Sequence, residues 1–250
     1  MPVYFRYRKV PGACSPSILA PRRNIRHTSP MPRTPLVRTS SFAYHVTARA
    51  NNKEWFYVPP ETAWRIFRAQ LAESADKYGV RLHAFVLMAN HYHLVLSTPE
   101  ANLDRFMRHF MTECCRRFQI ATGRINHIFG GRYRWSVLES AYGLAYVLKY
   151  VFRNPVRAGL CGRVEDYPHS SLSPTCSLPI SEGFDSYWRL IPKDWTRRLL
   201  WLNSPAAREI EEVIQRALRR RHFRLTSQGD WQSRVRTLRA SYGVGDADVQ

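Results

Sequence analysis

The order of hydrophobic periods along the chain limits its fold more than any other sequence feature. Phe42, Tyr44, Val46 and Ala48 alternate with the residues between them, which predicts a strand. After the two prolines at 59 and 60, apolar residues recur three and four positions apart. This spacing predicts a helix that ends near Gly79.

The next segments repeat the alternation between strand and helix. Two strand-like runs, 81–88 and 92–97, flank Ala89-Asn90 and predict a hairpin-like pair. A long helix with one apolar face then begins at Leu103, and Gly123 stops it.

The end of this region predicts a fourth strand over about 133–139 and a last helix over about 141–152. We expect this helix to end at Asn154-Pro155, because proline disfavours helix at the residue before it. The order β-α-β-β-α-β followed by a helix is typical of the ferredoxin-like split βαβ arrangement, an α+β fold. It predicts a four-stranded antiparallel sheet with two helices on one face. The other face is then free for a ligand or a further helix.

Three regions follow from composition. Residues 1–38 hold many Pro, Arg and Ser residues and predict a flexible, basic N-terminal arm, although a misplaced start codon would explain the same composition. Residues 39–172 contain the predicted sheet. Residues 173–250 have a weaker pattern, and we expect a helical, basic C-terminal extension there.

The charge of the chain indicates a polyanionic partner. Lys and Arg total 38 against 19 Asp and Glu, which gives a formal net charge of +19. Nucleic acid is the commonest such partner, because neutralising phosphates releases counterions. A merely basic protein, or one that meets anionic lipid, remains the alternative.

The cysteines and the hydropathy indicate the cellular compartment of the protein. The five cysteines form no C-x-x-C pair, so neither a disulfide framework nor a zinc ribbon is predicted. No apolar run reaches membrane-spanning length, and the basic N-terminus lacks the apolar segment of a secretory signal. We therefore expect a cytoplasmic protein with no membrane partner.

A pair of histidines on one predicted strand is the first candidate for chemistry. His91 and His93 are two residues apart, so their side chains point to the same face and can meet one metal ion. Imidazole binds several transition metals, and mixed nitrogen and oxygen sites also hold Mn²⁺ or Mg²⁺. An isolated His-x-His is nevertheless more often a pair of surface histidines.

Tyr150 and Asn154 are the second candidate. They lie four residues apart on the last predicted helix and therefore share a face. The phenol offers an oxygen nucleophile, and the amide offers a third metal ligand. Tyr142, Tyr146 and Tyr150 also form a stripe that is typical of a helix core, and Asn154 before a proline fits a helix cap. Spacing alone leaves both interpretations open.

A resemblance to a known family favours the catalytic interpretation. Residues 44–172 resemble the REP-associated tyrosine transposases, of the single-tyrosine HUH transposase superfamily. The phrases that carry the resemblance are Tyr44-His45-Val46 with Arg49 and Asn51, LHAFVLMANHYHLVLSTPE, HIFGGRYRWSVLES, YVFRNPVRAGL and EDYPHSSL. In that family two histidines and a polar residue one turn after the tyrosine bind a divalent metal. By position, the resemblance implies that His91, His93 and Asn154 hold Mg²⁺ or Mn²⁺ and that Tyr150 attacks the scissile phosphate.

The chain departs from the family pattern at three positions. Ala89 stands where a proline usually precedes the asparagine before the histidine pair. Ala50 stands where a glycine is usual, and Gly130 where a glutamine is common. The metal ligands are unaffected, whereas the last two changes put the usual DNA target in doubt.

Six further residues are predicted to contact single-stranded DNA. Two share a face of the first strand, two lie on the fourth strand, and two lie around the end of the last helix. They are His45, Arg49, Arg132, Arg134, Arg153 and Arg157. Each arginine could equally be a solvated surface charge.

The expected function is therefore metal-dependent nicking and strand transfer on single-stranded, hairpin-containing DNA of the REP type, through a 5′-phosphotyrosine. A monomer is favoured, and a dimer is the alternative. Other interpretations are a nucleic-acid-binding module that has lost catalysis, a replication or relaxase-type HUH nickase, and a structural protein with an incidental His-x-His.

Overall fold

The computed structural model of the chain describes residues 35–181, 190–205 and 208–223. Within these ranges, five strands form one sheet in the order β2-β3-β1-β4-β5. Their bounds are Ala43–Arg49 (β1), Arg81–Leu87 (β2), His91–Ser97 (β3), Arg134–Leu138 (β4) and His222–Phe223 (β5). The first four strands pair antiparallel in the predicted split βαβ topology, so the predicted α+β fold is confirmed.

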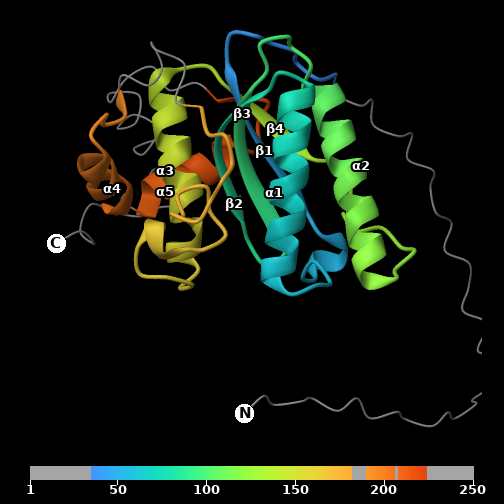
Figure 1. Ribbon diagram of the computed structural model, residues 1–250. Helices are drawn as coiled ribbons and strands as arrows, with labels where there is room; N and C mark the ends of the chain where they lie inside the picture. Colours follow the sequence, from blue (N-terminus) through green and yellow to red (C-terminus); the bar gives the residue numbers. More distant parts are fainter. Residues whose placement is uncertain (1–34, 182–189, 206–207, 224–250) are drawn as a thin grey trace, which may run out of the picture. The chain divides into compact units, whose positions relative to one another are not determined.

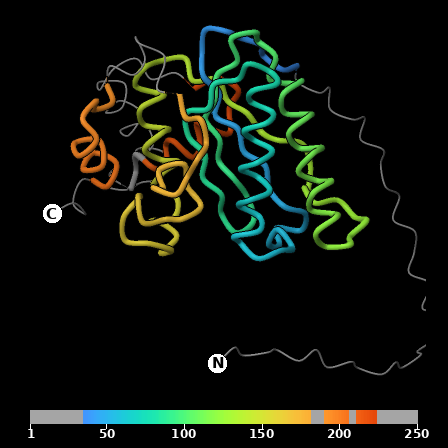
Figure 2. The backbone as a smooth tube through the Cα atoms, in the orientation of Figure 1, coloured from blue at the N-terminus to red at the C-terminus, as the bar shows by residue number. Residues whose placement is uncertain are grey.

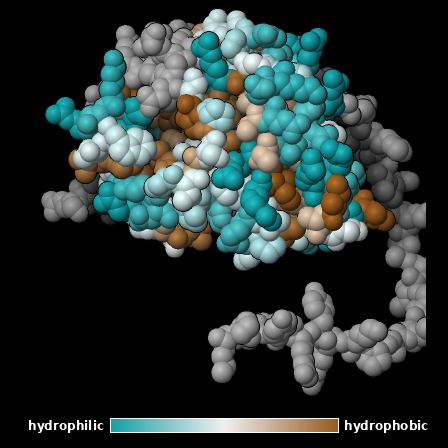
Figure 3. All heavy atoms as spheres, viewed as in Figure 1, coloured by the Kyte–Doolittle hydropathy of each residue, from teal (hydrophilic) through white to brown (hydrophobic). Residues whose placement is uncertain are grey.

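In the part of the chain that the structure describes, five α-helices lie on the two faces of this sheet (Figure 1). They are α1 (Pro60–Lys77), α2 (Leu103–Thr122), α3 (Ala141–Arg157), α4 (Trp195–Asn203) and α5 (Arg208–Ala217), with short 3-10 turns at Asn51–Lys53 and Val164–Asp166. Helices α1 and α2 cover one face, and much of the visible surface of α1 is hydrophilic (Figure 3). Among the described residues, no helix has both the length and the hydrophobicity needed to cross a bilayer.

Successive side chains along each strand point to opposite sides, so the sheet has two different faces. Tyr44, Val46 and Tyr92 belong to the core cluster under α1 and α2. The residues between them point the other way, and Val95 joins the core cluster that contains α3. Because the predicted histidine pair has the register of Val95, it lies on the α3 face.

The fifth strand corrects the predicted four-stranded sheet. Strand β5 pairs parallel with β4, with Leu138 opposite Phe223. Phe223 is almost fully buried, and it packs where α3 carries Gly143. A Cβ atom at Gly143 would lie 3.0 Å from the Phe223 ring, so the glycine makes room for this strand. A two-residue strand has too short a pattern to be recognised from sequence.

The end of α3 also differs from the prediction. The helix continues through Pro155 to Arg157 instead of ending at Asn154. Proline leaves the carbonyl four residues earlier, that of Val151, without its usual donor. The Asn154 side-chain amide donates to the Tyr150 carbonyl at 2.9 Å and reaches Val151 at 3.4 Å. This substitute donor lets the helix continue by one more turn.

The described part of the C-terminal region packs on α3. The described residues between Leu36 and Phe223 belong to one compact unit. Helices α4 and α5 both contact α3, and the tube in Figure 2 shows them on that side of the sheet. The domain boundary at residue 172 stays a prediction. Most of the predicted N-terminal arm, residues 1–34, lies outside the described residues.

Candidate active site

A cavity of about 970 Å³ opens on the α3 side of the sheet. Its wall combines the ends of β1 and β3, the loops beside them, α3 and the end of α5. Among its lining residues are His91, His93, Tyr150, Asn154, Arg49, Arg132 and Arg134. The residues predicted for metal binding and nucleophilic attack therefore share one cavity.

The histidine pair lies on β3 opposite β1. His93 pairs with Thr47 and His91 with Arg49. The two imidazole rings are 5.1 Å apart between centroids, on the same face of the strand. The spacing of His91 and His93 correctly predicted this shared direction.

Each histidine of the pair is held through its Nδ1 atom. Nδ1 of His91 is 2.8 Å from Oδ1 of Asn90, and Nδ1 of His93 is 2.9 Å from Nε2 of His45. In the part of the chain that the structure describes, no hydrogen bond involves Nε2 of His91 or His93. The Nε2 atoms are therefore the ring nitrogens left for a ligand, and metal-binding histidines are commonly held through their other ring nitrogen in this way.

His45, which is predicted to contact DNA, lies against His93 and also lines the cavity. Its side chain is buried, with 3% exposed, and its ring stacks on His93. Burial lowers the pKa of His45 to about 3. Its Nε2 atom is engaged by Nδ1 of His93, and the DNA contact stays a prediction.

Burial also keeps the histidine pair neutral. Burial lowers the pKa of His91 to about 4 and the pKa of His93 well below the ordinary value. Nearby positive charge from Arg49 acts in the same direction on both. At neutral pH both rings therefore carry a lone pair that a metal ion can accept.

Tyr150 faces the histidine pair from α3. Its ring centroid is 5.8 Å from that of His93, with the two rings nearly perpendicular. Burial raises the pKa of Tyr150, while the adjacent Arg157 opposes this rise. Asn154, one helical turn later, lines the same cavity.

These side chains form a donor set that fits a divalent metal ion. Two imidazole nitrogens come from His91 and His93. The Asn154 amide nitrogen is bonded to the helix backbone, so its Oδ1 atom is the group left to bind a metal. A mixed nitrogen and oxygen set suits Mn²⁺ or Mg²⁺. Among the described residues, no cluster of three or more His, Cys, Asp or Glu side chains is arranged to hold a metal.

The predicted DNA-contacting arginines fall into two groups. Arg49, Arg132 and Arg134 line the cavity. Arg153 is buried, and its Nη1 atom donates to the carbonyls of Leu202 and Asn203 at 3.4 and 2.6 Å.

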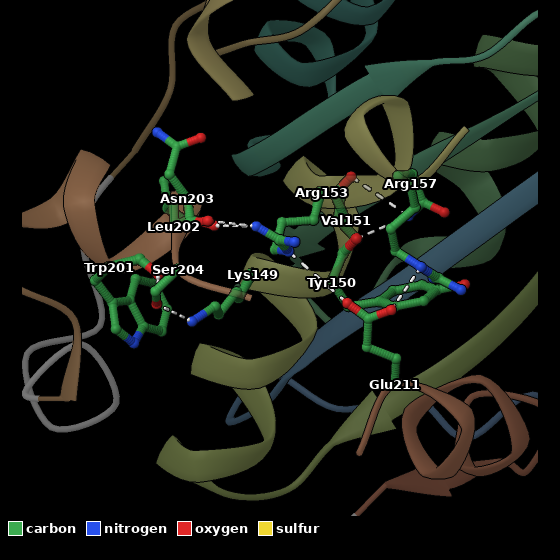
Figure 4. Close-up of polar contacts among 11 residues, drawn as sticks. Lys149, Tyr150, Val151, Arg153, Arg157, Trp201, Leu202, Asn203, Ser204 and Glu211 are labelled. Atoms are coloured by element: carbon green, nitrogen blue, oxygen red, sulfur yellow. Dashed lines mark hydrogen bonds and ion pairs between the residues drawn. The ribbon is translucent and has the colours of Figure 1, made fainter. Parts of the chain in front are cut away.

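Arg157 differs again, because its guanidinium pairs with Glu211 of α5 (Figure 4). Arg153 and Arg157 are thus engaged within the protein, and a DNA contact from either residue stays a prediction.

Other cavity residues were missed from the sequence. Asn51, Asn52 and Lys53 line the cavity from the turn after β1. Asn52 and Lys53 have positive φ angles of 53° and 62°, a conformation that asparagine tolerates better than most residues. The Asn51-Asn52 pair is the sequence signal that could have indicated this turn.

Helix α5 adds Gln215, and the turn after this helix adds Leu218 and Arg219. Nothing local in the sequence marks them as part of the site.

Two departures from the family pattern meet at this cavity. Gly130 donates its backbone N–H to the Arg49 carbonyl at 3.0 Å. A Cβ atom at Gly130 would lie 3.3 Å from the carbonyl oxygen of Ala50. Ala50 and Gly130 are therefore spatial neighbours, so the two changes alter one wall of the cavity together.

Comparison with known proteins identifies the domain. Residues 38–154 match the family model described as transposase IS200 like. This segment belongs to the IS200-like transposase family. Transposases of this family cleave DNA and transfer strands, so the chain carries the domain of such an enzyme. The predicted resemblance to the single-tyrosine transposases is therefore confirmed at the level of the protein family.

Solved structures are also similar to the transposase domain. One is a REP-associated tyrosine transposase bound to a REP hairpin, with 18% identity over 65% of this chain and all of that chain, and a TM-score of 0.48. Another is a candidate transposase from Deinococcus radiodurans R1, with 20% identity over 48% of this chain and 92% of that chain, and a TM-score of 0.35. No curated protein matches the chain.

Proposed function

We propose that this transposase nicks single-stranded DNA and transfers the cut strand through a covalent link to Tyr150. The observation that carries the proposal is the placement of the Tyr150 ring 5.8 Å from His93, in a cavity that both residues line. In this proposal His91, His93 and Asn154 hold Mg²⁺ or Mn²⁺. A bound divalent ion supplies Lewis-acid polarisation of the scissile phosphate.

The residues of the chain carry the remaining steps. Arg49, Arg132 and Arg134 hold phosphates of the strand in the cavity. The Tyr150 oxygen forms a bond to phosphorus, and the bond from phosphorus to the 3′ oxygen breaks. The phenol loses its proton, and the departing 3′ oxygen ends as a hydroxyl. A second 3′-hydroxyl reverses the step and joins the new partner, because the phosphotyrosine preserves the energy of the original bond.

The proposed substrate is single-stranded DNA that carries a hairpin of the REP type. This choice follows from the sequence resemblance and from the basic cavity. The proposed working form is a monomer, because His91, His93, Asn154 and Tyr150 all line the cavity of one chain.

The test uses the full chain with a labelled hairpin oligonucleotide and Mn²⁺. A product that survives denaturing electrophoresis is expected, and peptide mapping should place the DNA on Tyr150. A chelator should prevent its formation. An adduct on Tyr142 or Tyr146 would contradict the assigned nucleophile. Tight binding without any adduct, in either Mn²⁺ or Mg²⁺, would instead identify a binding module.

Replacing Arg134 with alanine should weaken DNA binding through the lost phosphate contact. The plot of log affinity against log salt concentration should become less steep. The magnitude of its slope should decrease by about 0.7, which is the contribution of one neutralised phosphate on a single strand. Binding titrations over a salt series measure this slope. Arg65→Ala is a suitable control, because Arg65 is exposed on α1, across the sheet. An unchanged slope for Arg134→Ala would remove this residue from the proposed interface.

Replacing His45 with alanine should weaken Mn²⁺ binding without removing a ligand. The change removes the partner of His93 Nδ1, and losses of such supporting contacts typically weaken metal binding by roughly 10–100-fold. His45→Gln, which returns a polar group, should recover part of the affinity. Calorimetric titration with Mn²⁺ measures both variants. Wild-type affinity in a folded His45→Ala protein would show that His45 does not position His93.

A further inference from the structure

A polar cluster joins α3, which carries Tyr150, to α5 in the C-terminal region. Oε2 of Glu211 is 2.7 Å from Nε of Arg157, and Oε1 is 3.7 Å from Nε of Arg153. The side chains are shielded from solvent, with 14% of Glu211 and 28% of Arg157 exposed. One carboxylate thus lies between two arginines of the same helix.

A second residue of α5 completes the anchoring of Arg157. The Gln215 carboxamide, oriented to satisfy its neighbours, accepts from both Nη atoms of Arg157 at 2.6 and 3.1 Å. The guanidinium therefore bonds to two side chains of α5 at once. Its Cζ atom is 5.4 Å from the centroid of the Tyr150 ring. Figure 4 shows Arg157 between Glu211 and Tyr150.

A neighbouring part of the same face of α3 is attached to α4 in a similar way. Lys149 donates to the Ser204 hydroxyl at 2.7 Å, and Arg153 donates to the carbonyls at the end of α4. Lys149 and Arg153 therefore attach α3 to α4, as Figure 4 shows. The turn of α3 that presents the nucleophile is thus attached to both C-terminal helices.

The ion pair is not needed simply to dock α5. Val213, Ile214 and Ala217 are buried in the core cluster that contains α3, and apolar burial of this kind is enough to attach a helix. Shielded ion pairs add little net stability, because desolvation offsets their attraction. A guanidinium that bonds to two side chains does, however, fix their relative geometry.

We propose that Glu211 and Gln215 of α5 position the Tyr150 nucleophile by holding Arg157 against it. The inference rests on the proposed function and extends it to the C-terminal region. Glu211 acts through Arg157 and is a positioning residue. Helix α5 also lines the cavity with Gln215, and the turn after it does so with Leu218 and Arg219, so this segment belongs to the cavity wall.

The experiment compares Glu211→Gln with the wild-type full chain. Three properties are measured: the single-turnover rate of adduct formation, the affinity for the same hairpin DNA, and hydrogen–deuterium exchange of α3. The adduct rate should fall on the order of 100-fold, as for a misplaced reactive group. The DNA affinity should change less than about two-fold, and amides of 148–157 should exchange faster. Glu113→Gln is the matched control, because Glu113 forms a 2.7 Å ion pair with Arg116 on α2, across the sheet.

Arg157→Lys provides a second test that keeps the positive charge. An ammonium group lacks the planar fork that reaches Glu211 and Gln215 together. Adduct formation should therefore also be slow in this variant. A wild-type adduct rate in either variant would overturn the inference. Unchanged exchange of α3 in Glu211→Gln would overturn it as well.

The two proposals fail in different ways. If the wild-type chain forms no adduct, the proposed function is wrong. The exchange of α3 in Glu211→Gln and Glu113→Gln then still decides whether α5 holds this helix in place.

Discussion

Replacing Tyr150 with phenylalanine is expected to abolish the covalent DNA adduct. The change removes one oxygen and keeps the ring that packs against His93. Loss of a catalytic nucleophile lowers rates by on the order of 10⁴-fold or more, which would place the variant below detection in an adduct assay. The folded structure and the DNA affinity should remain close to wild type, because the phosphate-binding arginines are unchanged.

Denaturing electrophoresis of the labelled DNA measures this effect, and binding titration provides the internal control. Tyr146→Phe is the matched variant, because Tyr146 lies one turn earlier on α3 and is also partly buried, yet does not line the cavity. It should retain the adduct. Persistence of the adduct in Tyr150→Phe would mean that another group attacks the phosphate.

Replacing His93 with alanine is expected to have the second-largest effect. It removes a proposed metal ligand from the buried end of the cavity, so Mn²⁺ affinity should fall by at least about 100-fold, more than for loss of a supporting contact. The adduct should be lost in parallel. His91→Ala should behave similarly, because His91 faces the same cavity from the same strand.

Titration with Mn²⁺ monitored by electron paramagnetic resonance measures the affinity directly. His83→Gln is a suitable control, because His83 is a buried histidine of the neighbouring strand β2 that bonds to Ser97 and Ser181, away from this cavity. Equal Mn²⁺ affinity in His93→Ala and the wild type would exclude His93 as a ligand.

Local sequence patterns determined the direction in which each candidate side chain points within its own element. The two-residue step from His91 to His93 places both imidazoles on one face of a strand, and the four-residue step from Tyr150 to Asn154 places both side chains on one face of a helix. The order of strands and helices followed from the same periodicities. The side-chain directions and the order of elements both depend on backbone geometry within one element. They can therefore be recognised from the sequence without knowledge of the rest of the fold.

Only the tertiary structure decided what lies opposite each of these side chains. Packing places His45 against His93. Helices α4 and α5, about fifty residues later in the chain, supply acceptors for Arg153 and Arg157. Strand β5 and the cavity residues of α5 gave no local signal. A contact between distant segments depends on how whole elements pack, and periodicity within one element carries no information about its partner.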